Sequence, residues 1–116
     1  MQISIADQSG PTARVIMAGK CDIAGAEVIA LPLATLAGSK KAVLVDMSGV
    51  TFLASIGIRH FVSASKALAR RGGRLVLLNP SDMVTDVLTT SGVNTMMDIV
   101  RSEGEAEAAL KPHTGA

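Results

Sequence analysis

The sequence predicts a single α/β domain whose sheet is mixed but mostly parallel, with about five strands and about four helices. Short apolar runs of strand length alternate with longer stretches that carry helical periodicity. Parallel strands need such crossovers, because a tight turn cannot join them. With 116 residues, 48% of them apolar, the chain is long enough for one hydrophobic core. We expect the domain to span residues 1–110, followed by a disordered tail at 111–116.

Composition narrows the functional class. The net charge of +1 gives no general attraction to nucleic acid or to a membrane surface. Cys21 is the single cysteine, which excludes an internal disulfide and fits a reducing compartment. No apolar run is long enough for a membrane span, and the N-terminus lacks the pattern of a signal peptide. We therefore expect a cytoplasmic protein that binds neither nucleic acid nor membrane.

The N-terminal stretch predicts a hairpin. Met1 to Ala6 alternates apolar and polar side chains, as a half-buried strand does. Asp7 to Thr12 contains Ser9-Gly10-Pro11, which is typical of a turn, and Arg14 to Ala18 forms the second strand.

A long helix is predicted next, from about Ala24 to Ala37. Asp22 precedes it and is a good N-cap, because its carboxylate can accept from free amides of the first turn. Pro32 lies inside this segment and removes one helical hydrogen bond, so we expect a kink or two separate helices.

The centre of the chain predicts a strand, a turn and a helix. Ala42 to Val45 is a continuous apolar run, as expected for a strand buried on both faces. Asp46 to Gly49 has turn chemistry, and Val50 to Ala54 is a second apolar run that leads to Ser55. Beyond Ser55 an amphipathic helix is predicted from a stripe at i, i+3, i+4, i+7, i+10 and i+11: Ile58, Phe61, Val62, Ser65, Leu68 and Ala69.

The C-terminal half continues the alternation. Gly72-Gly73 ends the central helix near Arg71, since glycine is favoured just past a helix. The remaining elements are a strand at Arg74–Leu78, a helix at Asp82–Thr90 capped by Ser81, a strand at Met96–Val100, and a final helix that begins in the capping-box pattern Ser102–Glu105 and reaches Leu110. The apolar strands and stripes predict these core residues: Leu44, Val45, Phe61, Leu68, Val76, Leu77, Val87 and Leu88.

Ser55 is predicted at a helix start, where it can have two roles. A serine hydroxyl there is a preferred N-cap. The free amides and the dipole of a helix N-terminus also favour a phosphate. Asp22 and Asp46 follow strands, and the carboxyl ends of parallel strands share the edge where ligands and partners bind.

The order of elements and the central stretch together resemble the STAS domain, specifically the anti-sigma factor antagonist family of bacteria. The resemblance covers about Ile3 to Leu110. The residues that carry it are Gly19 and Asp22, the run Asp46-Met47-Ser48-Gly49-Val50-Thr51-Phe52-Leu53, Ser55, Gly57, Gly72-Gly73 and Thr90-Ser91-Gly92-Val93.

This resemblance implies a binding switch. In the family, the unmodified domain binds an anti-sigma factor that is also a serine kinase, and binding frees the sigma factor. Phosphorylation of the serine at the start of the central helix ends the binding, and a serine phosphatase resets it. The matching position here is Ser55. The residues expected to contact the partner are Asp22, Ser48, Ala54, Ser55, Ile56, Gly57 and Arg59.

The chain departs from the family pattern around this serine. Ala54 stands where the family usually has Asp, Ile56 where it often has Ser or Thr, and Lys20 where Glu is frequent. An alternative is therefore a STAS module with another partner, such as a transporter-associated subunit or a signalling scaffold, that is never phosphorylated.

An enzyme is not expected. The stretch Leu53 to Gly57 is similar to the elbow that presents a hydrolase nucleophile, but it has Leu53 in place of the first glycine. A general base is missing too, since His60 is predicted to point away from Ser55 on the same helix. Asp22 and Asp46 are too few ligands for a cation, so no metal and no cofactor are expected.

Overall fold

The computed structural model describes residues 1–7 and 10–114 and confirms the predicted α/β class. Five strands form one sheet in the order β1-β2-β3-β4-β5. The strands are β1 Gln2–Asp7, β2 Thr12–Cys21, β3 Ala42–Leu53, β4 Arg74–Leu78 and β5 Asp98–Val100. The helices are α1 Ile23–Ser39, α2 Ser55–Arg70, α3 Asp82–Thr90, the short 3-10 helix η1 Val93–Thr95, and α4 Glu103–Thr114.

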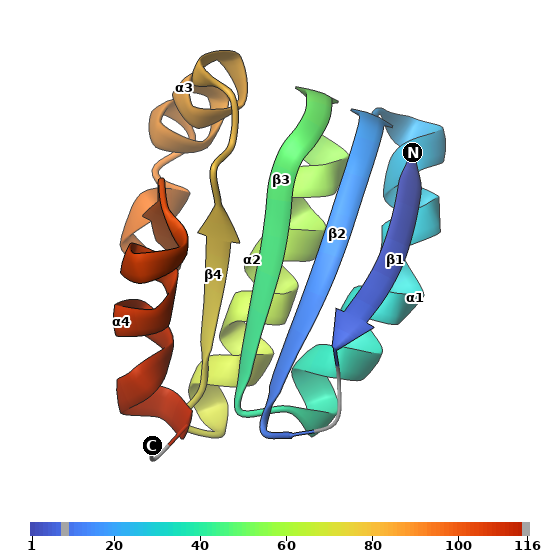
Figure 1. The fold of residues 1–116 in the computed structure, drawn as a ribbon. Helices are drawn as coiled ribbons and strands as arrows, with labels where there is room; N and C mark the ends of the chain where they lie inside the picture. The colour runs from blue at the N-terminus through green and yellow to red at the C-terminus, as the bar shows by residue number, and fades with distance from the viewer. Residues whose placement is uncertain (8–9, 115–116) are drawn as a thin grey trace.

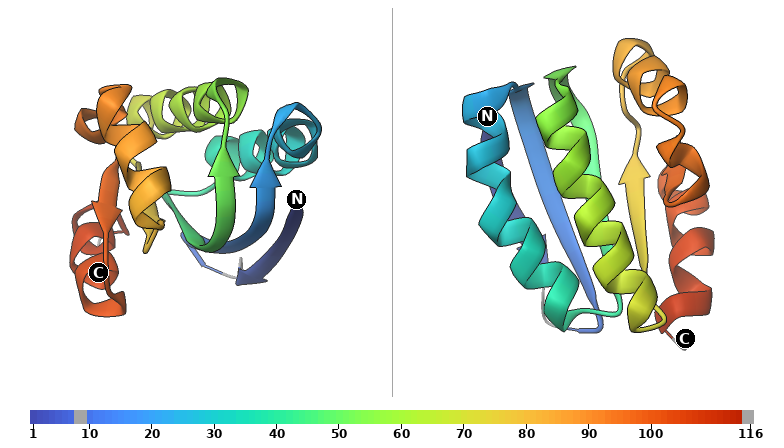
Figure 2. Two further views of the ribbon diagram at one scale, coloured as in Figure 1. Left: turned by 90° about the horizontal axis from the view of Figure 1, so that it is seen from above. Right: turned by 180° about the vertical axis from the view of Figure 1, so that it is seen from behind.

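The sheet is mostly parallel, as predicted. Among the described residues only the β1–β2 pair is antiparallel, and the pairs β2–β3, β3–β4 and β4–β5 are parallel. Gln8 and Ser9 of the predicted hairpin turn lie outside the described residues. Helices α1 and α2 lie side by side on one face, and α4 covers part of the other (Figures 1 and 2). The sheet consequently has a large apolar cluster on the α1 and α2 side and a small one under α4.

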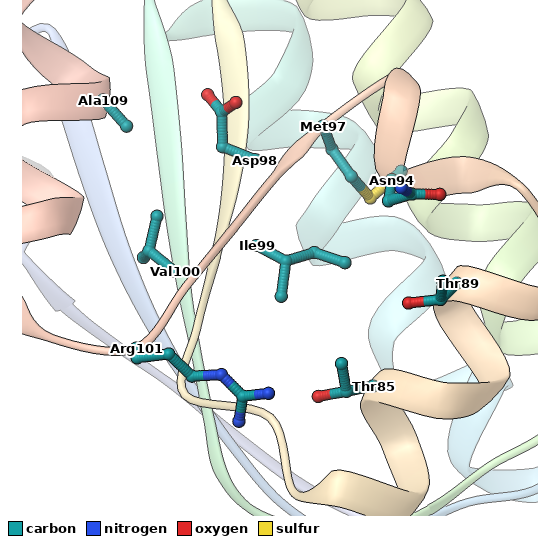
Figure 3. A pocket seen from close by; sticks show the side chains of 9 residues that line it. All are labelled: Thr85, Thr89, Asn94, Met97, Asp98, Ile99, Val100, Arg101 and Ala109. Carbon is teal, nitrogen blue, oxygen red and sulfur yellow. The ribbon is translucent and has the colours of Figure 1, made fainter.

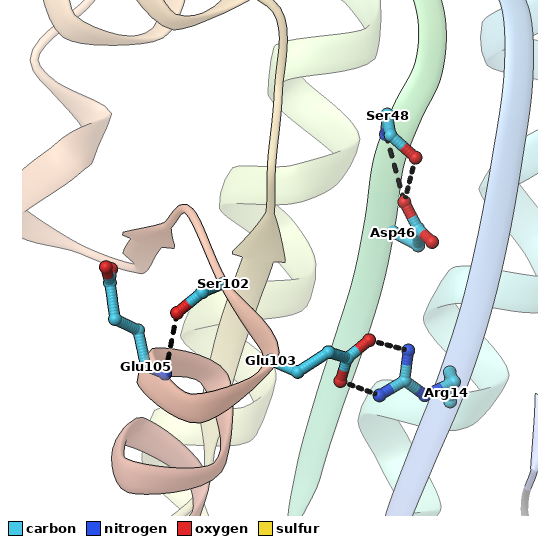
Figure 4. A network of polar contacts seen from close by, with 6 residues as sticks. All are labelled: Arg14, Asp46, Ser48, Ser102, Glu103 and Glu105. Atoms are coloured by element: carbon cyan, nitrogen blue, oxygen red, sulfur yellow. Dashed lines mark hydrogen bonds and ion pairs between the residues drawn. The ribbon is translucent and has the colours of Figure 1, made fainter.

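The turn predicted at Asp46–Gly49 is wrong, because β3 runs unbroken through it. Ile16 pairs with Asp46 and Ala18 with Gly49, so two residues of β3 stand opposite the single Met17 of β2. The Asp46 carboxylate accepts from the Ser48 amide at 3.0 Å and from the Ser48 hydroxyl at 2.6 Å (Figure 4). The turn-forming residues therefore make a β-bulge, which bends the strand without ending it.

Helix α1 is one element, so the alternative of two separate helices at Pro32 is wrong. Proline cannot donate to the carbonyl of Val28, four residues earlier. Val28 is 43% exposed, so water can supply the missing partner for that carbonyl. The predicted cap at the N-terminus is confirmed, since the Asp22 carboxylate accepts from the Gly25 amide at 2.8 Å.

The predicted role of Ser55 as the N-cap of α2 is wrong, because α2 begins at Ser55 itself and not at Ile56. The Ala54 carbonyl accepts from the amides of Gly57 at 3.0 Å and Ile58 at 3.2 Å, which makes Ala54 the N-cap and Ser55 the first helical residue. The C-terminus is as predicted. Gly72 has φ +78°, and the Gly73 amide donates to the Leu68 carbonyl at 2.7 Å, as in a Schellman motif.

The last elements differ from their predicted bounds. β5 is shorter than the predicted Met96–Val100, because η1 occupies the preceding residues. Ser102 caps α4 by accepting from the Glu105 amide at 3.2 Å, as predicted, whereas the Glu105 carboxylate accepts from the Arg101 amide instead of the Ser102 amide. α4 extends to Thr114, where the sequence predicted a disordered tail from Lys111, and residues 115–116 lie outside the described part.

The predicted core is confirmed at all but one position. Leu44, Val45, Phe61, Leu68, Val76, Leu77 and Leu88 are buried, whereas Val87 is half-buried at the edge of the main cluster. A bidentate pair between Arg14 and Glu103, at 2.9 and 2.5 Å, joins β2 to the start of α4 across β3 (Figure 4). Leu44 lies beneath this pair, which explains why β3 is covered on both faces near its beginning.

Candidate functional site

The candidate site lies at the edge of the sheet where the parallel strands end. The Ala54 amide donates to the Cys21 carbonyl at 2.9 Å, which joins the β3–α2 junction to the β2–α1 junction. Asp22 and Ser55 each follow one residue of this pair in the chain. The fold thus brings together two predicted site residues that lie far apart in sequence, and Figure 1 shows the starts of α1 and α2 at the same end of the sheet.

Ser55 has an exposed side chain at the first position of α2. Within the part of the chain that the structure describes, its hydroxyl makes no hydrogen bond, and no acidic residue lies in the first turn. The first amides of a helix have no intrahelical acceptor. The hydroxyl is therefore accessible, and the Ser55 and Ile56 amides, which precede the helical hydrogen bonds, can donate to an anion.

Gly57 is required by close packing under the start of α2. A Cβ at this position would lie 2.5 Å from the Cys21 sulfur and 2.9 Å from Leu53 Cδ1. Burial, and secondarily the negative charge of Asp22, raises the pKa of the Cys21 thiol. Cys21 is thus a packing group in its neutral form, consistent with the small buried side chain that free cysteine often provides.

The other predicted site residues differ in placement. Ile56 is half-buried and packs against the main core, while Arg59 is exposed and follows Ser55 by four positions, on the same side of the helix. Ser48 lies farther back along β3, in the bulge, where its hydroxyl donates to Asp46. The structure does not group Ser48 with Ser55.

Sequence reasoning missed three exposed apolar side chains at this edge. Ile23 is 72% exposed, Phe52 is 43% exposed and Met83, in the first turn of α3, is 62% exposed. Ile23 adjoins Asp22, and Phe52 precedes Ala54 by two positions. The residues that we call the Ser55 surface are Asp22, Ile23, Phe52, Ala54, Ser55 and Arg59.

Comparison of the sequence with known protein families identifies one. Residues 6–106 match the STAS domain family. The chain belongs to the STAS domain family. This confirms the predicted resemblance.

Among curated relatives of this STAS domain, the anti-sigma-B factor antagonist of Bacillus subtilis is 29% identical over 92 residues, 78% of this chain and 84% of the relative. The anti-sigma-B factor antagonist of Listeria monocytogenes is 33% identical over 61 residues, 53% of this chain and 54% of the relative. Both of these relatives are anti-sigma-B factor antagonists, and this chain is similar to them over the residues matched.

Solved structures share the fold. The anti-sigma factor antagonist SpoIIAA in its unphosphorylated form has a TM-score of 0.78 at 24% identity, covering 91% of this chain and 93% of that one. Its phosphorylated form, from Bacillus, has a TM-score of 0.71 at 23% identity, covering 92% and 97%. The murine anion transporter Slc26a9 matches 89% of this chain with 18% of its own, at a TM-score of 0.72 and 19% identity. In the described ranges of the present chain, no helix is both long and apolar enough to span a bilayer.

Proposed function

We propose that this STAS domain is an anti-sigma factor antagonist of the cytoplasm. Its Ser55 surface binds an anti-sigma factor that has serine kinase activity, and the bound anti-sigma factor releases its sigma factor. Phosphorylation of Ser55 by the same partner ends the complex, and a serine phosphatase restores the binding form. The domain itself acts by binding and catalyses no reaction.

The observation that carries this proposal is the setting of Ser55. Its exposed hydroxyl has no structural partner in the described part of the chain, and Ala54 takes the capping role. Two exposed apolar residues are near Ser55. Phe52 precedes it by three positions in the chain, and Ile23 follows Cys21, whose carbonyl accepts from the Ala54 amide. An exposed apolar surface of this kind is typical of a protein interface.

The physical basis of the switch is the cost of burying charge. A phosphate adds about −1.5 to −2 charges at neutral pH. On the free protein, the first amides of α2 can stabilise it, so modification leaves the fold intact. In a complex that covers the Ser55 surface, the same charge loses water, and the single positive charge of Arg59 offsets only part of that loss, so burial still costs several kcal/mol. SpoIIAA, which shares this fold, exists in an unphosphorylated and a phosphorylated form, and this supports the proposed switch.

The Ser55 surface can be tested by calorimetry with a purified anti-sigma factor kinase from the same host. Phe52→Ser should weaken binding by about tenfold or more, because it removes an apolar contact from the interface. Leu31→Ser is the matched control, since Leu31 is 75% exposed on α1 outside the Ser55 surface. Equal losses for the two variants, or no loss for Phe52→Ser, would contradict the proposed interface.

A second prediction concerns Ala54, where the family usually has Asp. Ala54→Asp should preserve the fold, because Asp is a better N-cap than Ala and its charge suits the helix dipole. If Ala54 weakens kinase recognition, the variant should be phosphorylated faster at Ser55, which a radiolabel transfer assay measures. An equal or slower rate would show that Ala54 suits the cognate kinase.

Ala54 and Ile56 also favour a second candidate, a STAS module with a different partner and no phosphorylation. The transporter Slc26a9, whose structure includes a region of the same fold, is an example of such a setting. Affinity capture from the native host, followed by identification of the bound protein, separates the two. An anti-sigma factor with an ATPase fold supports the first function, and a transporter subunit supports the second.

A further inference from the structure

A pocket of about 450 Å³ lies at the β5 end of the sheet, away from Ser55. Side chains from α3, η1, β5 and α4 line it, and Figure 3 shows them around an open space. β5 is an edge strand, bonded to β4 alone. The volume lies in the range of small-molecule sites, which is roughly 300–1,000 Å³.

Arg101, Thr85 and Thr89 are three of the five polar side chains that line this pocket, the others being Asn94 and Asp98. Arg101 Nη1 donates to the Pro80 carbonyl at 3.4 Å, and Thr85 Oγ1 donates to the same carbonyl at 3.3 Å. This shared acceptor holds the guanidinium and the hydroxyl close together. Thr89 follows one helical turn after Thr85, and Figure 3 shows both hydroxyls directed toward the side of the pocket where Arg101 lies.

The guanidinium retains donors for a ligand. Across residues 1–7 and 10–114, Nε and Nη2 of Arg101 make no hydrogen bond. The carboxylate of Asp98, which also lines the pocket, is held by Arg74 at 3.0 and 3.1 Å, so its charge is balanced. Asp82 is the anion paired with the Arg101 guanidinium in that range, at 3.7 Å from Nη1 with its side chain 98% exposed, whereas the Glu105 carboxylate accepts from the Arg101 backbone amide at 3.1 Å. At that exposure water screens most of the Asp82 charge.

The floor of the pocket combines an apolar side chain with open backbone groups. The Val100 carbonyl accepts from the Asn79 amide at 2.7 Å, so the backbone groups of Val100 face the β4 side of β5. Successive residues of a parallel strand alternate in direction, so the amide and carbonyl of Ile99 point to the open edge of the sheet. The Ile99 side chain lies at the centre of the pocket in Figure 3.

We propose that this pocket binds a small organic anion, a carboxylate or a phosphate monoester. Its charged group lies against the Arg101 guanidinium and the Thr89 hydroxyl, which makes no hydrogen bond in the part of the chain that the structure describes, and its apolar body lies on Ile99. A guanidinium with free donors and a neighbouring hydroxyl favour an oxyanion, since charge-assisted hydrogen bonds are the strong ones. No part of this argument involves Ser55, so the pocket can be tested independently of the switch.

The test is an NMR titration of isotope-labelled protein with acetate, hexanoate and inorganic phosphate. We expect saturable shifts of the Thr85, Ile99 and Arg101 amide signals with all three probes. Hexanoate should bind about tenfold more tightly than acetate, because its chain covers Ile99. Shifts that stay linear up to high probe concentration, or that spread evenly over the lysines and arginines, would mean that the pocket is not an anion site.

Three variants separate a built site from general charge attraction. Arg101→Gln keeps most of the side-chain length and should lower the affinity for each probe by about tenfold or more. Asp82→Asn removes the competing carboxylate and should raise the affinity by about twofold, without any risk to the core at 98% exposure. Lys66→Gln, on the exposed side of α2 and outside the pocket lining, is the control and should change nothing. Equal effects of Arg101→Gln and Lys66→Gln, or a loss of affinity in Asp82→Asn, would overturn the proposal.

Discussion

Protein phosphorylated at Ser55 should bind its anti-sigma factor at least about 100-fold more weakly than the unmodified protein. The loss follows from burying an unpaired charge of about −1.5 to −2 in the interface, which costs several kcal/mol. The Ser55 surface contains one basic residue, Arg59, and one acidic residue, Asp22, so it offers no cluster of positive charge to balance a phosphate. Calorimetry with protein phosphorylated in vitro measures the difference.

Ser55→Ala is the control for this experiment. It should bind like the unmodified protein, because the variant keeps the surface neutral and cannot be phosphorylated. Its unfolding free energy should change by less than about 0.5 kcal/mol, since Ser55 is exposed and Ala54 is the cap. Ser55→Asp carries one charge and should lie between the two forms. If the unmodified, Ala and phosphorylated proteins bind alike, Ser55 is not a switch.

Local chemistry was sufficient to predict most of the elements. The boundary of α2 at Gly72-Gly73 came from glycine preference, and the structure shows the expected Schellman hydrogen bonds. Arg74–Leu78 was predicted at its observed bounds, because a short apolar run between glycine and Asn-Pro has few alternatives. These signals are contained within a few neighbouring residues, so a single sequence reveals them.

The β-bulge and the exposure of Phe52 could not be predicted from neighbouring residues, because both depend on how β3 pairs with β2. Asp46–Gly49 has turn-forming residues, and only the pairing with β2 makes that segment a bulge. A second register shift follows between Gly19 and Lys20, opposite Val50 and Phe52. Alternation along β3 is interrupted at these shifts, which is why Phe52 is exposed although it lies in an apolar run.

At the candidate site, too, the sequence predicts the local feature but not the contacts between distant residues. The prediction of Ser55 at a helix start depended on a change of periodicity, which locates a helix boundary only within a few residues. Whether Ser55 or Ala54 caps α2 is decided by the Ala54 carbonyl, and the structure gives that role to Ala54. The β5 pocket had no sequence signal, because Thr85 of α3 and Arg101, which follows β5, lie apart in sequence and meet only at the Pro80 carbonyl.

Phe61→Ala should lower the unfolding free energy by about 3–5 kcal/mol, as large core truncations do. Phe61 is 1% exposed and is the largest of the fully buried side chains in the described residues. It lies on the stripe of α2 that faces the sheet, within the main apolar cluster. The chain has only two aromatic residues, so the aliphatic neighbours of Phe61 must fill the space that its ring leaves.

Urea unfolding monitored by far-ultraviolet circular dichroism measures this loss, provided that the slope of the transition matches the wild-type slope. Phe52→Ala is the matched control, because the same ring is removed from a site that is 43% exposed. That variant should lose no more than about 1 kcal/mol, since surface truncations leave no cavity. A loss for Phe61→Ala below about 1 kcal/mol, or equal losses for the two variants, would mean that α2 does not pack on the sheet through this stripe. The comparison therefore tests the packing that positions Ser55 at the edge of the sheet.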